Sequence, residues 1–128
     1  MSEVPADLRY TKEHEWARRD DDRVVVGITD YAQDQLGDVV FVGLPEVGAD
    51  VEAGKPLGEV ESTKSVSDVY SPISGRIAAT NPEVEQNPEL VNEEPYGRGW
   101  LVAIEGGDID GLMSADEYKA LIEGAASA

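Results

Sequence analysis

Two short runs of mixed apolar and polar residues near the middle of the chain, residues 57–62 and 66–70, have strand character and are separated by a few small polar residues. Neighbouring strands joined by a tight turn give this pattern, which predicts a β-hairpin with Lys64 at its tip. Tight hairpins favour Asn-Gly or Asp-Gly, whereas Thr63-Lys64 offers no residue that readily adopts positive φ. Such a local departure from turn chemistry indicates a functional position.

The segment before the hairpin contains further elements. Residues 23–28 form a clear strand pattern, and residues 30–36 predict a short helix. Thr29 or Asp30 can cap the helix N-terminus, Gln33 occupies the position of a capping box, and Gly37 suits the helix end.

Three predictions complete the layout. Residues 39–44 are apolar at both alternating positions, which predicts a strand buried on both faces. Asn81-Pro82 predicts a turn. Near the C-terminus, a helix is predicted over about residues 114–123, with Ser114 and Glu117 as a capping box and an apolar stripe of Tyr118, Leu121 and Ile122 that packs on the sheets.

A short internal similarity suggests two comparable halves. Asp38-Val39 is matched by Asp68-Val69, and residues 51–57 by residues 84–90, at nearly the same offset. Two such halves of short strands could pack face to face as a sandwich joined at the hairpin. With 128 residues, we expect a single mainly β domain over residues 1–128, with its core at about residues 8–105.

Composition narrows the possible functions. A formal net charge of −17 argues against nucleic-acid and membrane partners and favours partners with basic docking surfaces, although a charged soluble surface or adaptation to salt explains it equally well. The chain has no cysteine and one histidine, so we expect no disulfide, no metal site and few acid–base catalysts. The N-terminus lacks a signal-peptide pattern, so a chain that begins here is expected to be cytoplasmic.

Motifs for catalysis are also missing from the sequence. No Gly-rich phosphate loop and no Gly-x-Ser-x-Gly motif occur, and in so acidic a chain a pair of carboxylates carries no information about catalysis. We therefore expect no catalytic residues and no enzyme activity of its own. A lysine displayed on a rigid hairpin instead suits covalent attachment of a prosthetic group, because its amine can be acylated.

Several motifs occur in order along nearly the whole sequence, at residues 10–16, 27–33, 36–42, 61–65, 71–75, 90–92 and 95–100. With these motifs the chain resembles the glycine cleavage H-protein family of lipoyl carriers, in which they stand in the same order. The resemblance implies a barrel-sandwich hybrid (lipoyl-domain-like) fold of two small sheets with a short internal helix and a C-terminal helix. It also implies lipoate on Lys64, within an attachment motif of Glu61, Ser62, Thr63 and Ser65.

The resemblance further implies a carrier cycle. The lipoyl arm would accept the aminomethyl group of glycine from glycine decarboxylase (the P protein) and deliver it to the aminomethyltransferase (the T protein). Dihydrolipoyl dehydrogenase (the L protein) would reoxidise the arm, and a lipoyl or octanoyl transferase or a lipoate ligase would attach it. We expect the carrier to be a monomer.

Two further hypotheses concern the groove for the arm and the single histidine. Glu15 and Asp68, and with them Glu13, are expected to line a groove that receives the loaded arm, because its amine is cationic at neutral pH. His14, between two glutamates, is interpreted as a hydrogen-bonded structural residue.

Three alternatives to this function remain. The chain could be a biotinyl or other lipoyl carrier domain, a lipoyl relay protein, or a non-modified β-sandwich that binds partners. Biotin sites, however, resemble Ala-Met-Lys-Met, unlike Thr63-Lys64-Ser65.

Overall fold

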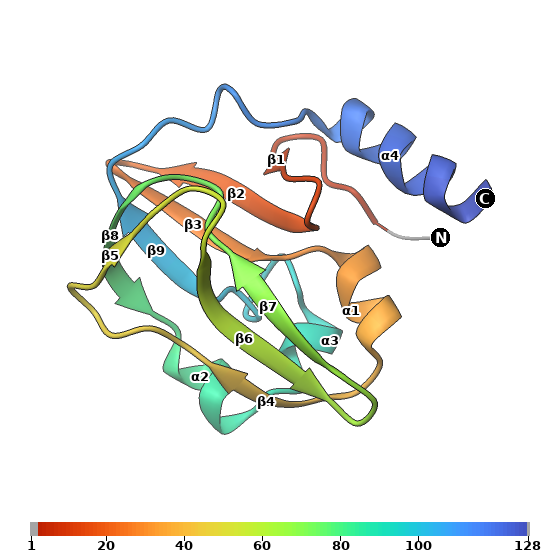
Figure 1. Cartoon of the computed structure of the whole chain (residues 1–128), viewed down its shortest axis with the longest axis horizontal. Helices are drawn as coiled ribbons and strands as arrows, with labels where there is room; N and C mark the ends of the chain where they lie inside the picture. The colour runs from red at the N-terminus through yellow and green to blue at the C-terminus, as the bar shows by residue number, and fades with distance from the viewer. Residues whose placement is uncertain (1–2, 128) are drawn as a thin grey trace.

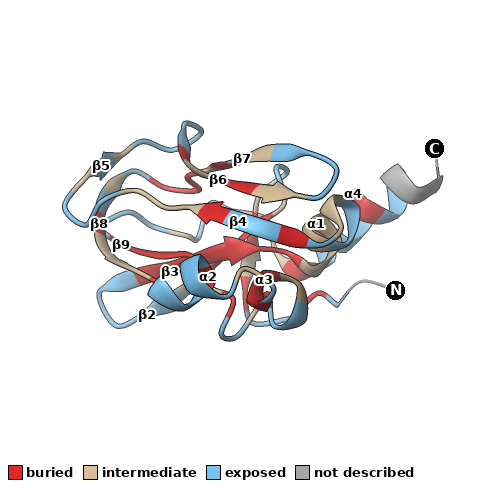
Figure 2. Ribbon diagram, turned by 90° about the horizontal axis from the view of Figure 1, so that it is seen from below, coloured by how far each residue is buried: buried red, intermediate tan, exposed pale blue. Residues whose placement is uncertain are grey.

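The computed structural model describes residues 3–127 and consists mainly of two antiparallel sheets that pack face to face (Figures 1 and 2). The larger sheet has the strand order β1 (Arg9–Tyr10), β2 (Glu15–Asp20), β3 (Arg23–Ile28), β9 (Val102–Glu105), β8 (Gly75–Thr80) and β5 (Asp50–Val51). The smaller sheet has the order β4 (Val39–Gly43), β6 (Pro56–Ser62) and β7 (Val66–Tyr70). The helices are α1 (Asp30–Leu36), α2 (Pro82–Gln86), α3 (Leu90–Glu93) and α4 (Ala115–Ser127).

This architecture confirms the predicted mainly β fold, with a short internal helix and a C-terminal helix. Inward-facing side chains of both sheets form one core, to which the larger sheet contributes Val26 and Ile104 and the smaller sheet Val42 and Val60. Each of these is at most 1% exposed. Figure 2 shows buried segments facing one another across the two layers. Burial of aliphatic side chains from both layers holds the smaller sheet, and with it the hairpin, in place.

A second core covers the opposite face of the larger sheet, where α4 and the N-terminal segment pack. The rings of Tyr10 and Tyr118 stack with centroids 4.8 Å apart. Trp16 is fully buried, and its Nε1–H donates to the carbonyl of Pro95 at 2.9 Å. Gly27, opposite Trp16 in the β2–β3 register, leaves room for the indole, since a Cβ there would lie 2.7 Å from its ring atoms.

The C-terminal helix begins with the predicted capping box. The amide of Ser114 donates to Glu117 Oε1, and the amide of Glu117 donates to Ser114 Oγ. Tyr118 and Ile122 are buried, as predicted for the apolar stripe, whereas Leu121 is 38% exposed. The stripe is therefore narrower than predicted.

The strand prediction for residues 39–44 was wrong about burial. β4 lies at the edge of the smaller sheet, and its register shifts between Val39 and Phe41. Val39 and Val42 face the core, whereas Val40 and Phe41 are 55% and 48% exposed. A strand of the smaller sheet has only one face to bury, so apolar residues at both alternating positions do not imply two buried faces.

Two local predictions and the internal similarity also needed correction. Thr29, and not Asp30, caps α1, so Gln33 lies one position beyond that of a capping box and donates to Asp30 Oδ1 instead. Asn81-Pro82 starts α2, with Asn81 as the N-cap. Residues 51–57 lie in strands and their connection, whereas their counterparts include α2. The hairpin therefore belongs to one sheet and does not link two similar halves.

Among residues 3–127, no helix has the length and apolar character needed to cross a membrane.

Candidate functional site

Lys64 lies at the exposed tip of the β6–β7 hairpin, beside the C-terminal end of α1 (Figure 1). The two strands pair in antiparallel register up to Glu61 and Val66. The ladder therefore ends just before the tip, and residues 63–65 form the connection.

Ser62 supplies the turn chemistry that Thr63-Lys64 lacks. Its hydroxyl oxygen accepts hydrogen bonds from the amides of Lys64 and Ser65, at 3.2 and 3.1 Å. Its own amide donates to the carbonyl of Ser65 at 2.8 Å. Positive φ among the non-glycine residues that the structure describes occurs only at His14 and Asp21, so the tip needs none. A serine side chain thus replaces the Asn-Gly expected of a tight hairpin.

The connection after α1 supports the tip from the side. The amide of Thr63 donates to the carbonyl of Asp38 at 3.1 Å. Gly37 has φ 83° and ψ −157°, a region that side chains rarely enter. A Cβ on Gly37 would lie 3.1 Å from Lys64 Cε, so the aliphatic stem of Lys64 rests on this glycine.

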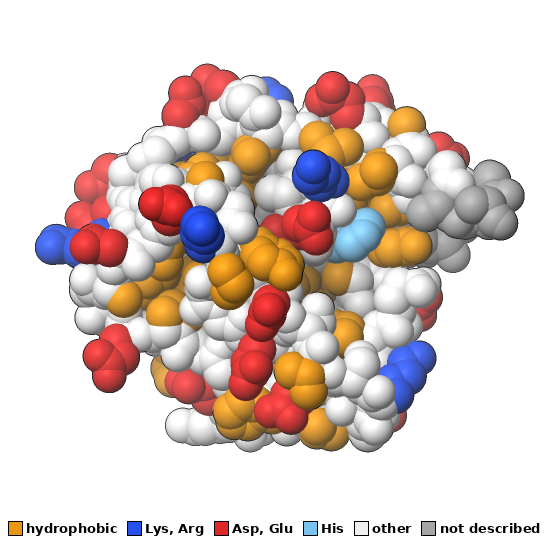
Figure 3. All heavy atoms as spheres, viewed as in Figure 1, with side chains coloured by type: hydrophobic (Ala, Val, Ile, Leu, Met, Phe, Trp, Pro, Cys, Tyr) orange, Lys and Arg blue, Asp and Glu red, His pale blue; other side chains and the backbone are white. Residues whose placement is uncertain are grey.

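A groove of about 420 Å³ begins at Ser65, the residue that follows Lys64 in the chain. It runs between β7, α1 and the segment before β2, and we call it the β7 groove. Its lining residues are Glu13, His14, Glu15, Ile28, Tyr31, Ala32, Gln35, Leu36, Val60, Ser65, Val66, Ser67, Asp68 and Val69. On this side of the molecule, acidic side chains lie between hydrophobic ones, with single Lys or Arg side chains among them (Figure 3).

All three carboxylates expected near the arm line the β7 groove, but their environments differ. Glu13 and Asp68 are exposed, whereas Glu15 is 2% exposed. Thr11 Oγ1 donates to Glu15 Oε1 at 2.6 Å, and the amide of Tyr70 donates to Glu15 Oε2 at 3.1 Å. Of the attachment-motif residues, only Ser65 reaches the groove, while Glu61, Ser62 and Thr63 remain on the hairpin.

Burial changes the protonation of Glu15. Loss of hydration raises the pKa of this carboxyl to about 7, although the hydrogen bonds from Thr11 and Tyr70 oppose the change. At neutral pH the carboxyl of Glu15 is therefore present in both protonation states. A cation that enters the groove would favour the ionised form.

His14 connects the groove to the C-terminal helix. Its backbone adopts a left-handed conformation with φ 73°, and its Nδ1 lies 2.8 Å from the hydroxyl of Tyr118. That hydroxyl is also 2.7 Å from Thr29 Oγ1, the cap of α1. Burial lowers the pKa of His14, which favours the neutral form of its ring. The interpretation of His14 as a hydrogen-bonded residue is confirmed, and it lies in the groove wall as well.

Sequence reasoning missed two contributors to this site, Gly37 and Tyr118. Gly37 was predicted to end a helix, and no local pattern indicated its contact with a lysine 27 positions later. Tyr118 was assigned to an apolar stripe, and only the fold brings its hydroxyl to His14. A buried tyrosine needs a partner for its hydroxyl, which is the one signal that could have drawn attention to it.

Comparisons with known proteins identify the family of the chain. Residues 8–125 match the family model described as Glycine cleavage H-protein. The glycine cleavage system H protein of Mycolicibacterium smegmatis is 59% identical over 95% of this chain and 98% of its own length. That of Rubrobacter xylanophilus is 54% identical over 96% and 98%. The crystal structure of a glycine cleavage system H protein from Mycobacterium marinum superposes with a TM-score of 0.89 at 43% identity, covering 94% of this chain and 99% of that one. The chain therefore belongs to the glycine cleavage H-protein family of lipoyl carriers.

Proposed function

We propose that the chain carries lipoate as an amide on Lys64 and acts as the mobile carrier of a glycine cleavage system. The observation that supports this most is an exposed lysine on a hydrogen-bonded hairpin tip, one residue from a groove with an apolar wall and three carboxylates. The apolar wall includes Ile28, Leu36 and Val60, which suit an aliphatic chain. Family membership agrees with this assignment.

Lipoate would supply the chemistry, namely a strained disulfide that takes up the aminomethyl carbon on one sulfur while the other sulfur becomes a thiol. The P protein would load the arm, the T protein would unload it, and the L protein would restore the disulfide. A lipoyl or octanoyl transferase or a lipoate ligase would first acylate Lys64. The chain itself positions the arm. Because it contains no cysteine, it has no thiol that could trap the arm in a mixed disulfide.

The β7 groove would hold the loaded arm between enzymes. Asp68 and Glu13 are exposed carboxylates that can attract a cationic amine, and Glu15 lies deeper in the wall. An amine at the groove floor would lower the pKa of Glu15 from its raised value of about 7 and gain a charged partner away from bulk water. Shielding from water would slow the loss of the aminomethyl group.

Decarboxylation measured with purified components tests the carrier role. The lipoylated chain with glycine and the P protein is expected to release carbon dioxide, and the chain with glycine alone is not. Lys64→Arg should fold normally yet support no turnover, because a guanidinium keeps the charge but cannot form the lipoyl amide. Release by the chain alone, or turnover by Lys64→Arg, would contradict the proposal.

A double variant tests the groove. Glu15→Gln with Asp68→Asn keeps the shape of both side chains and removes both charges, so Lys64 should still be lipoylated while the loaded carrier breaks down faster. Glu46→Gln with Asp116→Asn is the matched control, since both residues are exposed and neither lines the groove. Equal decay of the loaded groove variant, the control and the wild type at neutral pH would show that the groove does not act through these carboxylates.

A further inference from the structure

Asn92, on the short helix α3, uses both ends of its side-chain amide on the segment that follows α1. Its Nδ2 donates to the carbonyl of Gly37 at 2.8 Å and to Gln33 Oε1 at 2.9 Å. Its Oδ1 accepts the amide of Val39 at 2.8 Å. Both N–H donors and the carbonyl of this amide are therefore engaged. The side chain bridges the turn from α1 to β4 and holds one backbone group on each side of Asp38.

The residues held by Asn92 are the ones on which the hairpin tip rests. Asp38, between the two backbone groups that Asn92 holds, accepts the hydrogen bond from the amide of Thr63. Gly37 lies against the stem of Lys64. Asn92 thus acts on the tip indirectly, through Gly37 and Asp38. Among the described residues it forms no hydrogen bond with Lys64, and it does not line the β7 groove.

We propose that Asn92 is a positioning residue for acylation of Lys64. This inference rests on the proposed function, in which Lys64 accepts lipoate. The amine of Lys64 extends from the backbone by the length of one lysine side chain. An enzyme that acylates it must therefore bind directly to the hairpin tip. A tip already fixed in one geometry loses less conformational entropy on docking and places the amine close to the reacting acyl group. Asn92 supplies part of that fixed geometry by anchoring residues 37–39.

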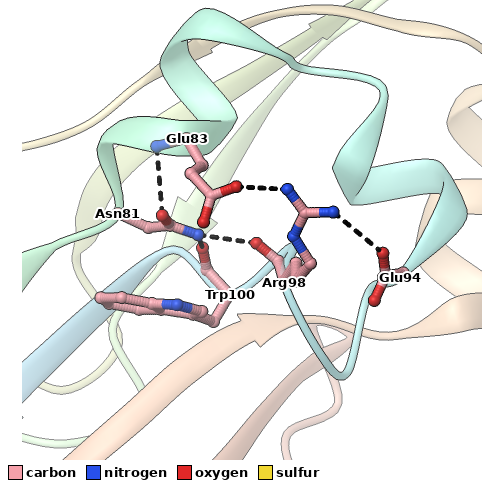
Figure 4. Close-up of polar contacts among 5 residues, drawn as sticks. All are labelled: Asn81, Glu83, Glu94, Arg98 and Trp100. Carbon is pink, nitrogen blue, oxygen red and sulfur yellow. Dashed lines mark hydrogen bonds and ion pairs between the residues drawn. The ribbon is translucent and has the colours of Figure 1, made fainter.

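A purely structural role for Asn92 makes a different prediction, and Asn81 is the matched control. Asn81 also uses its whole amide on backbone groups, donating to the carbonyls of Arg98 and Trp100 and accepting from the amide of Glu83 (Figure 4). Arg98 forms ion pairs with Glu83 and Glu94 around it. Asn81 is 3% exposed, so its replacement should cost at least as much stability, but among the described residues none of its partners hydrogen-bonds to the hairpin tip.

The experiment compares Asn92→Ala, Asn92→Asp and Asn81→Ala with wild type in the unmodified full chain. Asn92→Asp has the same shape and keeps the acceptor for Val39, but it loses both donated hydrogen bonds. Amide hydrogen exchange by NMR reports the Thr63 amide, and steady-state acylation by a lipoate ligase with lipoate and ATP reports KM and kcat. Urea unfolding of each variant shows that the folded protein is being compared.

Both Asn92 variants are expected to speed exchange of the Thr63 amide by about tenfold and to raise the KM of the chain for acylation by a similar factor, with a smaller change in kcat. Asn81→Ala should change neither quantity, although it unfolds at lower urea concentration. If the Asn92 variants exchange and acylate like Asn81→Ala while wild type is acylated at Lys64, the positioning role is wrong and the proposed function stands. If wild type is not acylated at Lys64, the proposed function fails and the inference fails with it.

Discussion

Glu15 should make the folded protein less stable as pH rises from about 4.5 to about 7. Its pKa is about 7 in the folded chain, where burial penalises the charge, and near its ordinary value of 4.5 in the unfolded chain. Between these values the folded state holds a proton that the unfolded state has released, so the free energy of unfolding falls with increasing pH. The difference of about 2.5 pKa units corresponds to roughly 3 kcal/mol, lost above pH 7 and fully regained below 4.5.

Glu15→Gln isolates this contribution. The glutamine amide can donate to Thr11 Oγ1 from the place of Oε1, and its carbonyl can accept the Tyr70 amide from the place of Oε2, so it mimics the protonated acid at every pH. We expect the variant to match wild type near pH 4.5 and to exceed its free energy of unfolding by roughly 3 kcal/mol near pH 8.

Urea unfolding monitored by the fluorescence of Trp16 and Trp100 measures this difference across the pH range. Glu46→Gln, at an exposed position outside the groove, is the control and should follow wild type at every pH. A stability difference between Glu15→Gln and wild type that does not change between pH 4.5 and 8 would refute the assignment of a buried carboxyl with a raised pKa to this position.

Two substitutions test the supports of the site. Gly37→Ala places a Cβ at φ 83°, where non-glycine residues cost about 1–3 kcal/mol, and pushes it against Lys64 Cε. Urea unfolding should show this loss of stability. The control Gly111→Ala, whose Cβ would meet open space, should be near neutral. Equal stability of the two variants would contradict backbone strain at position 37. Tyr118→Phe removes the hydroxyl that lies within hydrogen-bond distance of both His14 and Thr29, and it should lower the free energy of unfolding by about 1–3 kcal/mol at pH 7. A loss well below this range would mean that these hydrogen bonds contribute little.

The elements that sequence predicts well are those fixed by local chemistry. The strand character of residues 66–70, the cap at Thr29 and the glycine at position 37 each act within a few residues, and the structure has the corresponding strand, helix start and helix end. Asn81-Pro82 was misassigned because a polar residue before proline suits both a turn and a helix start with proline in its first turn.

The predictions that failed depend on contacts between distant residues. Gln33 could form a capping box only with Asp30 as the N-cap, but Thr29 is the cap and the Asp30 amide donates to the hydroxyl of Tyr96. Nothing in residues 39–44 reveals that their strand lies at a sheet edge with Phe41 exposed. The raised pKa of Glu15 likewise requires the fold, since its largest cause is burial beneath β7.

The central claim is that Lys64 receives lipoate, and peptide mapping by mass spectrometry after acylation by a lipoate ligase tests it most directly. Lys12, Lys55 and Lys119 serve as internal controls, because they are exposed and lie outside the hairpin tip. The account predicts one lipoyl group per chain, all of it on the peptide that contains Lys64, and none on Lys64→Ala. Lipoylation that persists in Lys64→Ala, or that is spread over the other lysines, would contradict the account.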